Sequence, residues 1–339
     1  MTGQLAELTE VHRSGRVESF HLGAAVVVDA TGQTLASAGP PDFSTYLRSA
    51  AKPFQLLTML DLGLERTGSF GGHELAVCAA SHGGEPEHVA TVRGLLARAG
   101  LGEELLQCGG HWPLDDLARE TLLRNGCSAP LPIYNNCSGK HAAMLITCVA
   151  NGWPLASYLE PDHPLQAHVE GVVAAMAGER PGIGADGCGV PTYFLSLAST
   201  ARAVAALMAL AGEEGAARRV VQAMTGYPWF TSGTHRLAYN LMRVCPGLLA
   251  KEGAEGFFAV GIPADRSPWA VPVGFVMKVF DGAGEDARGR EPAVASALLS
   301  LGLVRDTERP ALEALATQPL RTVAGRVVGE LRGVLRLRP

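Results

Sequence analysis

Lysine is scarce in this sequence of 339 residues. Of its 28 basic residues, 24 are arginine and four are lysine, at positions 52, 140, 251 and 278. Since arginine is the general choice for positive charge here, we expect lysine where an amine must lose its proton and act as a base or a metal ligand. Lys278 lies in an apolar run, and for this residue a lysine without a functional role is an equally good interpretation.

The sequence also lacks the patterns of several other protein classes. It has no basic run interleaved with aromatic residues, and its net charge of −5 argues against nucleic acid as the main partner. No apolar stretch reaches the ~20 residues that cross a bilayer. The first residues have neither the basic nor the apolar segment of a signal peptide. We therefore expect a cytoplasmic protein without a membrane partner.

Paired cysteine motifs are absent as well. The seven cysteines are scattered and form no C-x-x-C pair, so neither a zinc ribbon nor a thioredoxin-like redox site is predicted. In a reducing cytoplasm, a free cysteine is by default a small buried side chain. The sequence also has no H-E-x-x-H motif and no zinc-deaminase signature, which argues against a zinc protease or a base deaminase.

What the sequence does contain is the composition of a globular protein, 47% hydrophobic and 18% charged, in a chain long enough for two domains. Residues 17–38 have the pattern of two strands around a turn, and 256–263, 269–282 and 327–337 have that of further strands. Residues 52–250 show mainly helical spacing. These patterns predict an α+β fold with a sheet from both chain ends and a helical part inserted between them.

Two lysines stand where an amine could activate a serine. The spacing Ser49-x-x-Lys52 places both side chains on one face of a helix, so the amine can take the hydroxyl proton. Lys251, in the segment KEG, precedes a predicted strand, and Ser81 lies in a loop between the two. Penicillin-recognising enzymes have these elements in this order, although with Ser or Thr in place of Glu252. A capping serine beside a solvated lysine is the alternative for S-x-x-K alone.

A second group of residues has the chemistry of a metal site. Cys137 lies in NNCSGKHAAM, and Cys188 lies in DGCGVP, where flanking glycines allow close approach. Two thiolates with a neutral nitrogen and a water would suit zinc in the open pattern of a catalytic site. On the residues alone, His141 is the natural nitrogen, and two buried cysteines in ordinary turns are the alternative.

Five successive segments, YLRSAAKPFQ, CAASHGGEPEH, NNCSGKHAAML, DGCGVP and AKEGAEGFF, resemble the signature blocks of the rhizobial-type L-asparaginases, the thermolabile asparaginase II family. The resemblance runs from about residue 15 to the end of the sequence. It implies a fold similar to serine β-lactamases, penicillin-binding proteins and glutaminases. The antiparallel sheet domain would comprise residues 1–45 and 251–339, and the mainly helical domain residues 46–250.

The resemblance also implies an activity, the hydrolysis of L-asparagine to L-aspartate and ammonia by a homodimer. Its catalytic residues would be two serine–lysine tandems, Ser49 with Lys52 and Ser81 with Lys251. Ser49 would be the nucleophile that forms an acyl-enzyme. A related amidohydrolase such as a glutaminase is one alternative, and a non-catalytic zinc or amino-acid binding protein is another.

The same resemblance implies one zinc ion per chain, held by Cys137, Lys140 and Cys188, so that the nitrogen ligand is the lysine. We expect this Zn²⁺ to support substrate binding rather than to supply a hydroxide. Four further residues match family positions around the substrate: Arg48, His141, Asp186 and Cys245. Arg48 suits the α-carboxylate of the substrate and Asp186 suits its α-ammonium group.

Overall fold

The structure, a computed structural model, describes residues 4–280 and 288–337. Its larger sheet has eight strands in the order β10-β11-β1-β2-β9-β8-β7, with β3 paired to β2, and every pairing is antiparallel. A smaller antiparallel sheet has the order β4-β6-β5. The strands are β1 (Ala6–Arg13), β2 (Arg16–Asp29), β3 (Thr34–Ala38), β4 (Ser44–Tyr46), β5 (Gly182–Ala185), β6 (Pro191–Ser196), β7 (Leu249–Glu252), β8 (Phe257–Ile262), β9 (Val273–Val279), β10 (Thr317–Arg321) and β11 (Val327–Gly333).

The large sheet is buried on both faces at its centre. Because successive side chains of a strand point to opposite faces, Ala24, Val26 and Val28 of β2 join one hydrophobic cluster, and Ala25 and Val27 join the other. The first cluster lies under the helical part of the molecule, and the second includes side chains of the helices α10 (Leu237–Val244), α11 (Arg290–Ser300) and α12 (Arg309–Ala316). The sheet is therefore the middle layer between two helical layers.

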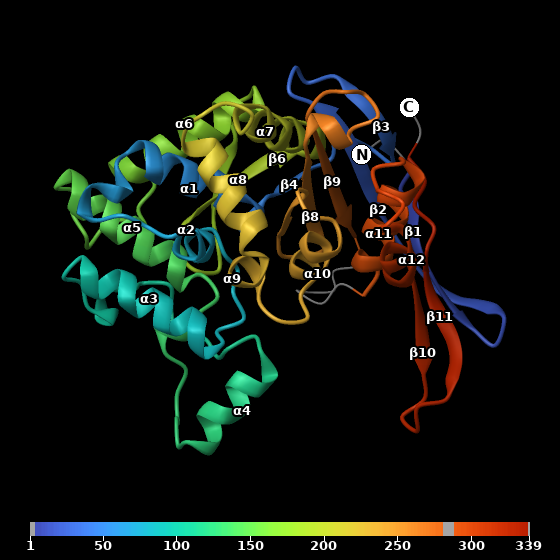
Figure 1. Ribbon diagram of the computed structural model, residues 1–339, viewed down its shortest axis with the longest axis horizontal. Coiled ribbons are helices and arrows are strands. Elements are labelled where there is room, and N and C mark those ends of the chain that lie inside the picture. The colour runs from blue at the N-terminus through green and yellow to red at the C-terminus, as the bar shows by residue number, and fades with distance from the viewer. Residues whose placement is uncertain (1–3, 281–287, 338–339) are drawn as a thin grey trace.

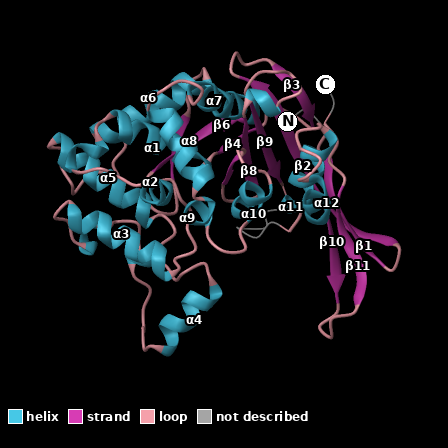
Figure 2. Ribbon diagram, in the orientation of Figure 1, coloured by secondary structure: helices cyan, strands magenta, loops and turns pink. Residues whose placement is uncertain are grey.

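The helices gather mainly at one end of the molecule, and the large sheet lies at the other (Figures 1 and 2). A typical case is α6, which begins at a proline and ends at Gly178 in the left-handed conformation. The helices are α1 (Lys52–Asp61), α2 (Gly72–Cys78), α3 (Pro86–Arg98), α4 (Asp116–Arg124), α5 (Ser138–Asn151), α6 (Pro164–Ala177), α7 (Leu197–Leu210), α8 (Ala216–Gly226), α9 (Pro228–Ser232), α10 (Leu237–Val244), α11 (Arg290–Ser300) and α12 (Arg309–Ala316).

Helix α7 connects the helical part to the sheet, and its approach to β9 depends on one glycine. A Cβ atom at Gly274 would lie 2.0 Å from the backbone oxygen of Ala201, so only glycine allows α7 to pack this closely. In the described residues no helix is both long and apolar enough to cross a membrane.

The predicted α+β class is confirmed, with an antiparallel sheet from both chain ends and a helical part between them. The expected strand pairs at 17–38 and 256–282 correspond to β2–β3 and β8–β9. No sequence pattern predicts β1, whose residues alternate without a strong apolar face. Nor does any pattern predict the small sheet, whose strands are short.

Candidate active site

Ser81 lies between two buried lysines that come from different parts of the fold. Lys52 is the first residue of α1, and its Nζ donates to the backbone oxygen of Ala80 at 2.6 Å and to Ser81 Oγ at 2.9 Å. Lys251 lies on β7, and its Nζ donates to Ser81 Oγ at 2.9 Å and to the Glu252 backbone oxygen at 3.0 Å. The helical part and the sheet thus each place one amine on the same hydroxyl.

Ser49 lies beside this group without joining its hydrogen bonds. It is half-buried in a 3₁₀ helix (Arg48–Ala51) and lines a small cavity with Ser81 and four residues from the other side. Within the described part of the chain, no side-chain hydrogen bond joins Ser49 to Lys52. The predicted partners Ser81 and Lys251 are therefore hydrogen-bonded to each other. Lys52 donates to Ser81 rather than to its predicted partner Ser49, whose hydroxyl faces the cavity.

The backbone just before Ser49 is strained. Arg48 has a φ of 50°, in the left-handed region, at a cost of about 1–3 kcal/mol for a residue other than glycine. Its N–H donates to Thr192 Oγ1 at 3.1 Å, and its Nε donates to Asp186 Oδ1 at 2.5 Å. Both contacts hold the turn against the strand β6 and the loop before it, so the position of Ser49 is fixed by tertiary contacts.

Burial shifts the pKa of Lys251 towards neutrality. Removal from water lowers its pKa to about 7, helped by the positive charges of Lys52 and Arg236 and opposed by the carboxylate of Glu252. For Glu252, burial works to raise the pKa, but the charges of Arg236 and Lys251 outweigh it and give a value of about 2. At neutral pH the site therefore combines an ionised carboxylate with an amine that can exchange its proton.

Cys137, Lys140 and Cys188 come together next to this centre. Cys137 caps α5, Lys140 lies in its first turn, and Cys188 comes from the loop between β5 and β6. Lys140 Nζ donates to Cys188 Sγ at 3.0 Å, and the two thiols are hydrogen-bonded to each other. A Cβ at Gly139 would lie 2.3 Å from the Val77 backbone oxygen, so glycine is needed to bring α5 this close to α2.

Within the thiol–amine group of Cys137, Lys140 and Cys188, the Lys140 ammonium and the Cys188 thiolate form an ion pair. A hydrogen bond from Cys137 and the charge of Lys140 hold the pKa of Cys188 well below its usual value, against the effect of burial. The same hydrogen bond between the two cysteines, together with burial, raises the pKa of Cys137. Burial alone would lower the pKa of Lys140, but the negative charges of Cys188 and Cys137 raise it. Cys188 and Lys140 thus compensate each other's charge.

These three side chains fit the donor set of a zinc ion. Two sulfurs and one nitrogen converge in a site where each side chain is nearly fully buried. No group of three or more His, Cys, Asp or Glu side chains within the described ranges is arranged for a metal, so a metal here needs the Lys140 amine. His141 Nδ1 instead lies 2.7 Å from the Tyr158 hydroxyl, while its Nε2 is buried without a partner.

The predicted substrate-binding residues do not all lie in the same part of the structure. Arg48 and Asp186 form an ion pair with each other, and Asp186 Oδ2 also lies 3.7 Å from Cys188 Sγ. Cys245 lies in the second hydrophobic cluster, hydrogen-bonded with Arg266 and Glu308. Of the predicted residues, Cys245 is therefore the one whose contacts lie away from both the serine–lysine centre and the thiol–amine group.

Two residues that the sequence analysis leaves unassigned also line the small cavity. Glu252 follows Lys251 in the segment KEG and Arg236 precedes α10, and both face the two serines. Glu252 is unusual because penicillin-recognising enzymes have Ser or Thr at this position of the Lys-x-Gly segment. No motif singles out Arg236 among the 24 arginines.

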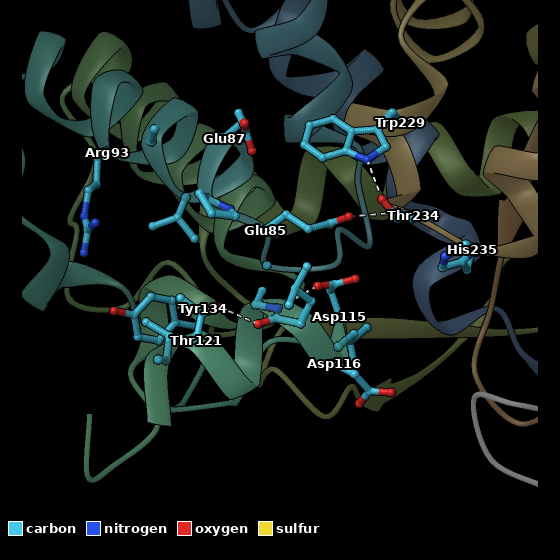
Figure 3. Close-up of a pocket in the computed structure, with 18 residues that line it drawn as sticks. Glu85, Glu87, Arg93, Asp115, Asp116, Thr121, Tyr134, Trp229, Thr234 and His235 are labelled. Carbon is cyan, nitrogen blue, oxygen red and sulfur yellow. Dashed lines mark hydrogen bonds between the residues drawn. The ribbon is translucent and has the colours of Figure 1, made fainter. Parts of the chain in front are cut away.

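A larger cavity of about 830 Å³ lies nearby, between α3 and α4 (Figure 3). Leucines and other apolar side chains of both helices line it, together with Trp229 and Glu85. Its polar wall is satisfied internally: Trp229 Nε1 donates to Thr234 Oγ1 at 2.9 Å, and the Thr234 N–H donates to Glu85 Oε1 at 2.9 Å. None of the predicted catalytic residues lines this cavity.

Comparisons with known proteins extend over most of the chain. Residues 9–333 match the model of the family described as L-asparaginase II. No curated protein matches the chain. Among solved structures, a Bacillus glutaminase has 14% sequence identity and a TM-score of 0.43, with 87% of this chain and 89% of that chain covered. A probable glutaminase of Bacillus subtilis also has 14% identity and a TM-score of 0.43, with 87% of each chain covered.

Proposed function

The chain belongs to the L-asparaginase II family of amidohydrolases, and on this premise we propose that it hydrolyses L-asparagine to L-aspartate and ammonia. The family match confirms the resemblance seen in the five sequence segments. One observation carries the proposed mechanism: a serine hydroxyl is hydrogen-bonded to two buried lysine amines, beside a second serine that faces a cavity. A nucleophile, a base and a proton carrier are what hydrolysis of an amide requires.

In this mechanism Ser49 is the nucleophile. Its hydroxyl has no side-chain hydrogen bond within the described residues and is the more exposed of the two serines, whereas Ser81 is 2% exposed. Ser49 Oγ attacks the amide carbon and its proton passes to the Lys52 amine. Ser81, hydrogen-bonded to Lys52 and Lys251, gives its proton to the departing nitrogen and takes in its place the proton that Lys52 received, so ammonia leaves and an ester remains. Water hydrolyses this ester to release aspartate and free Ser49.

Zinc, if bound, would be held by Cys137, Lys140 and Cys188. Its chemistry there would be to fix charge and geometry beside the substrate, because Ser49 already supplies the nucleophile. Asp186 contacts both Cys188 and Arg48. A structural change at Cys188 would therefore be passed through the Asp186 carboxylate to Arg48, in the strained turn before Ser49.

Turnover of L-asparagine and L-glutamine, measured side by side as ammonia release, tests the proposed function. Preference for L-asparagine supports it. Preference for L-glutamine would make the protein a glutaminase, and turnover of neither amide would favour a binding protein. The same assays with and without a chelator separate a metal requirement from substrate choice.

We predict that the purified protein carries one zinc ion per chain and that Cys137→Ser and Cys188→Ser each lose it. Loss of a thiolate removes a negative charge as well as a ligand from a buried site, so the remaining pair cannot balance Zn²⁺. Metal analysis of the folded variants decides the claim. Cys127→Ser is the matched control, because Cys127 is only partly buried and lies on the loop after α4. Stoichiometric zinc in either site variant would refute the ligand assignment.

We also predict that kcat/KM rises with pH through about 7, the pKa of Lys251. Below this pH Lys251 is protonated and cannot take up, through Ser81, the proton that Lys52 receives from Ser49; above it the amine is neutral and can. A kcat/KM profile from pH 5.5 to 9 measures the limb. A flat profile across this range would contradict a proton-transfer role for Lys251.

Stability provides a control that does not depend on turnover. Because the folded pKa of Lys251 lies below the ~10.4 of an unfolded lysine, the unfolded chain binds more protons between these values. The free energy of unfolding therefore gains from this residue as pH rises from about 7 to about 10, by up to ~1.4 kcal/mol per pH unit. Urea unfolding of the wild type and of Lys251→Met should differ in this slope.

A further inference from the structure

The cavity shared by the two serines has a charged wall. Arg236 and Glu252 form it opposite Ser49 and Ser81, and Arg236 Nε lies 3.9 Å from Glu252 Oε1. Both charged side chains are largely buried, at 18% and 3% exposure. The family resemblance assigns no role to either residue.

Arg236 is incompletely bonded for a buried cation. Its Nε is shielded from solvent and has no hydrogen-bond partner, and the described residues provide its guanidinium with only the distant contact to Glu252. More than about nine in ten buried polar groups are hydrogen-bonded, and a guanidinium carries five donors in a planar fork. A buried Nε without a hydrogen-bond partner, on an arginine that lines the cavity of the two serines, indicates an anionic ligand, and a carboxylate is the bidentate match for a guanidinium.

Glu252 does not supply the hydrogen bond that Arg236 Nε lacks, because its carboxylate oxygens already accept other hydrogen bonds. It accepts a hydrogen bond from the Ala238 N–H at 2.8 Å and from Ser232 Oγ at 3.2 Å. These contacts tie β7 to the end of α9 and to the start of α10, where Arg236 is the capping residue. Glu252 is thus a positioning residue that holds the arginine at the cavity without satisfying it.

The other arginine near Ser49 is in a different state. Arg48 is already paired with a carboxylate, because its Nε donates to Asp186 at 2.5 Å and the two side chains form an ion pair. Arg236 has no such bond to give up. A substrate carboxylate would therefore lose less binding energy to rearrangement at Arg236 than at Arg48.

We propose that Arg236 binds the α-carboxylate of the amino-acid substrate and thereby selects α-amino-acid amides over simple amides. This inference rests on the proposed function, because it assigns a substrate group to the same cavity. The cavity of about 10 Å³ is smaller than an amino acid, so the substrate has to widen it, with its carboxylate at Arg236 and its scissile amide at Ser49. Arg236 is then a specificity-determining residue that touches the substrate away from the reacting carbon.

The test compares L-asparagine with 3-aminopropanamide, which is the same amide without the α-carboxylate. The wild type should prefer L-asparagine in kcat/KM by at least about 100-fold, the effect of two charge-assisted hydrogen bonds. Arg236→Gln should reduce this preference to a few-fold, mainly by raising the KM for L-asparagine. Arg236→Lys, which keeps the charge but not the fork, should lie between them. A loss that acts through the pKa of Lys251 lowers kcat/KM for both amides alike and leaves their ratio unchanged.

Arg243→Gln is the matched control, because Arg243 is an exposed cation on the same helix, where it stacks on Tyr239. It should retain the full preference for L-asparagine. An Arg236→Gln protein that is folded, by its melting curve, and keeps the preference would overturn the proposal. So would an Arg48→Gln protein that loses the preference while Arg236→Gln keeps it.

Failure of the proposed function would look different. In that case the wild type releases ammonia from neither L-asparagine nor L-glutamine, and calorimetric binding of L-aspartate and β-alanine replaces the kinetic assay. Tighter binding of L-aspartate that Arg236→Gln abolishes supports the carboxylate site even then. Equal binding of the two ligands by the wild type overturns it.

Discussion

Ser49→Ala is expected to lower kcat for ammonia release from L-asparagine by at least about 1,000-fold, since removal of a serine nucleophile can cost up to ~10⁶-fold. The Ser49 side chain makes no hydrogen bond within the described residues, so its loss should leave the melting temperature nearly unchanged. Ser69→Ala, on an exposed loop, is the control and should keep wild-type turnover. Ammonia assays and melting curves of the three proteins provide the comparison.

The two serines can also be told apart by covalent labelling. A diazoketone analogue of asparagine should modify the wild type once per chain, and peptide mass spectrometry should locate the label on Ser49. A label on Ser81, with a folded Ser49→Ala protein that keeps more than about a tenth of the wild-type rate, would reverse the roles of the two residues.

Lys52→Arg and Lys251→Arg are each expected to lower kcat/KM by about 100- to 10,000-fold, the usual contribution of a general acid or base. Arginine keeps the positive charge, but it does not lose a proton near neutral pH. Its larger head group also cannot enter the space where Lys52 Nζ lies 2.6 Å from the Ala80 oxygen and 2.9 Å from Ser81. The loss should therefore appear in kcat as well as in KM.

Lys278→Arg is the matched control for this pair, because Lys278 lies on β9 and lines neither cavity. It should keep near-normal kinetics and stability. Near-normal kinetics for Lys52→Arg or Lys251→Arg would mean that the residue supplies only charge, and the proton transfer assigned to it would be wrong.

Local sequence patterns were informative about the strands at the chain ends because those strands are apolar and bounded by turns. The segment 17–38 contains both the alternation of β2 and the Asp29 carboxylate, which accepts hydrogen bonds from Thr31 and Gln33 in the turn. By contrast, β7 has only four residues, and its inclusion in the sheet depends on pairing with β8 rather than on its own pattern.

The sequence indicated several of the residues that the structure brings together, but neither Arg236 nor the hydrogen bonds among them. The S-x-x-K spacing assumes a regular helix, but Ser49 lies in a 3₁₀ helix and Lys52 begins the α-helix, so the amine contacts Ser81 instead. That contact joins residues 29 positions apart and depends on how α1 packs against the loop after α2. Arg236 has no local signal, since its unsatisfied guanidinium exists only once α10 and β7 meet.

The order of the strands in the large sheet has a consequence for synthesis on the ribosome. Strand β2 is made early, but its neighbour β9 (Val273–Val279) leaves the ribosome on the order of tens of seconds later, at ~5–20 residues per second. A nascent chain that ends at α10 carries Ser49, Lys52 and Ser81 without Lys251, so the Ser81 hydroxyl has only one of its two amine partners. Meanwhile one apolar edge of β2 stays open to pairing with other chains. The interval before β9 emerges is thus the time at which this enzyme most needs a chaperone.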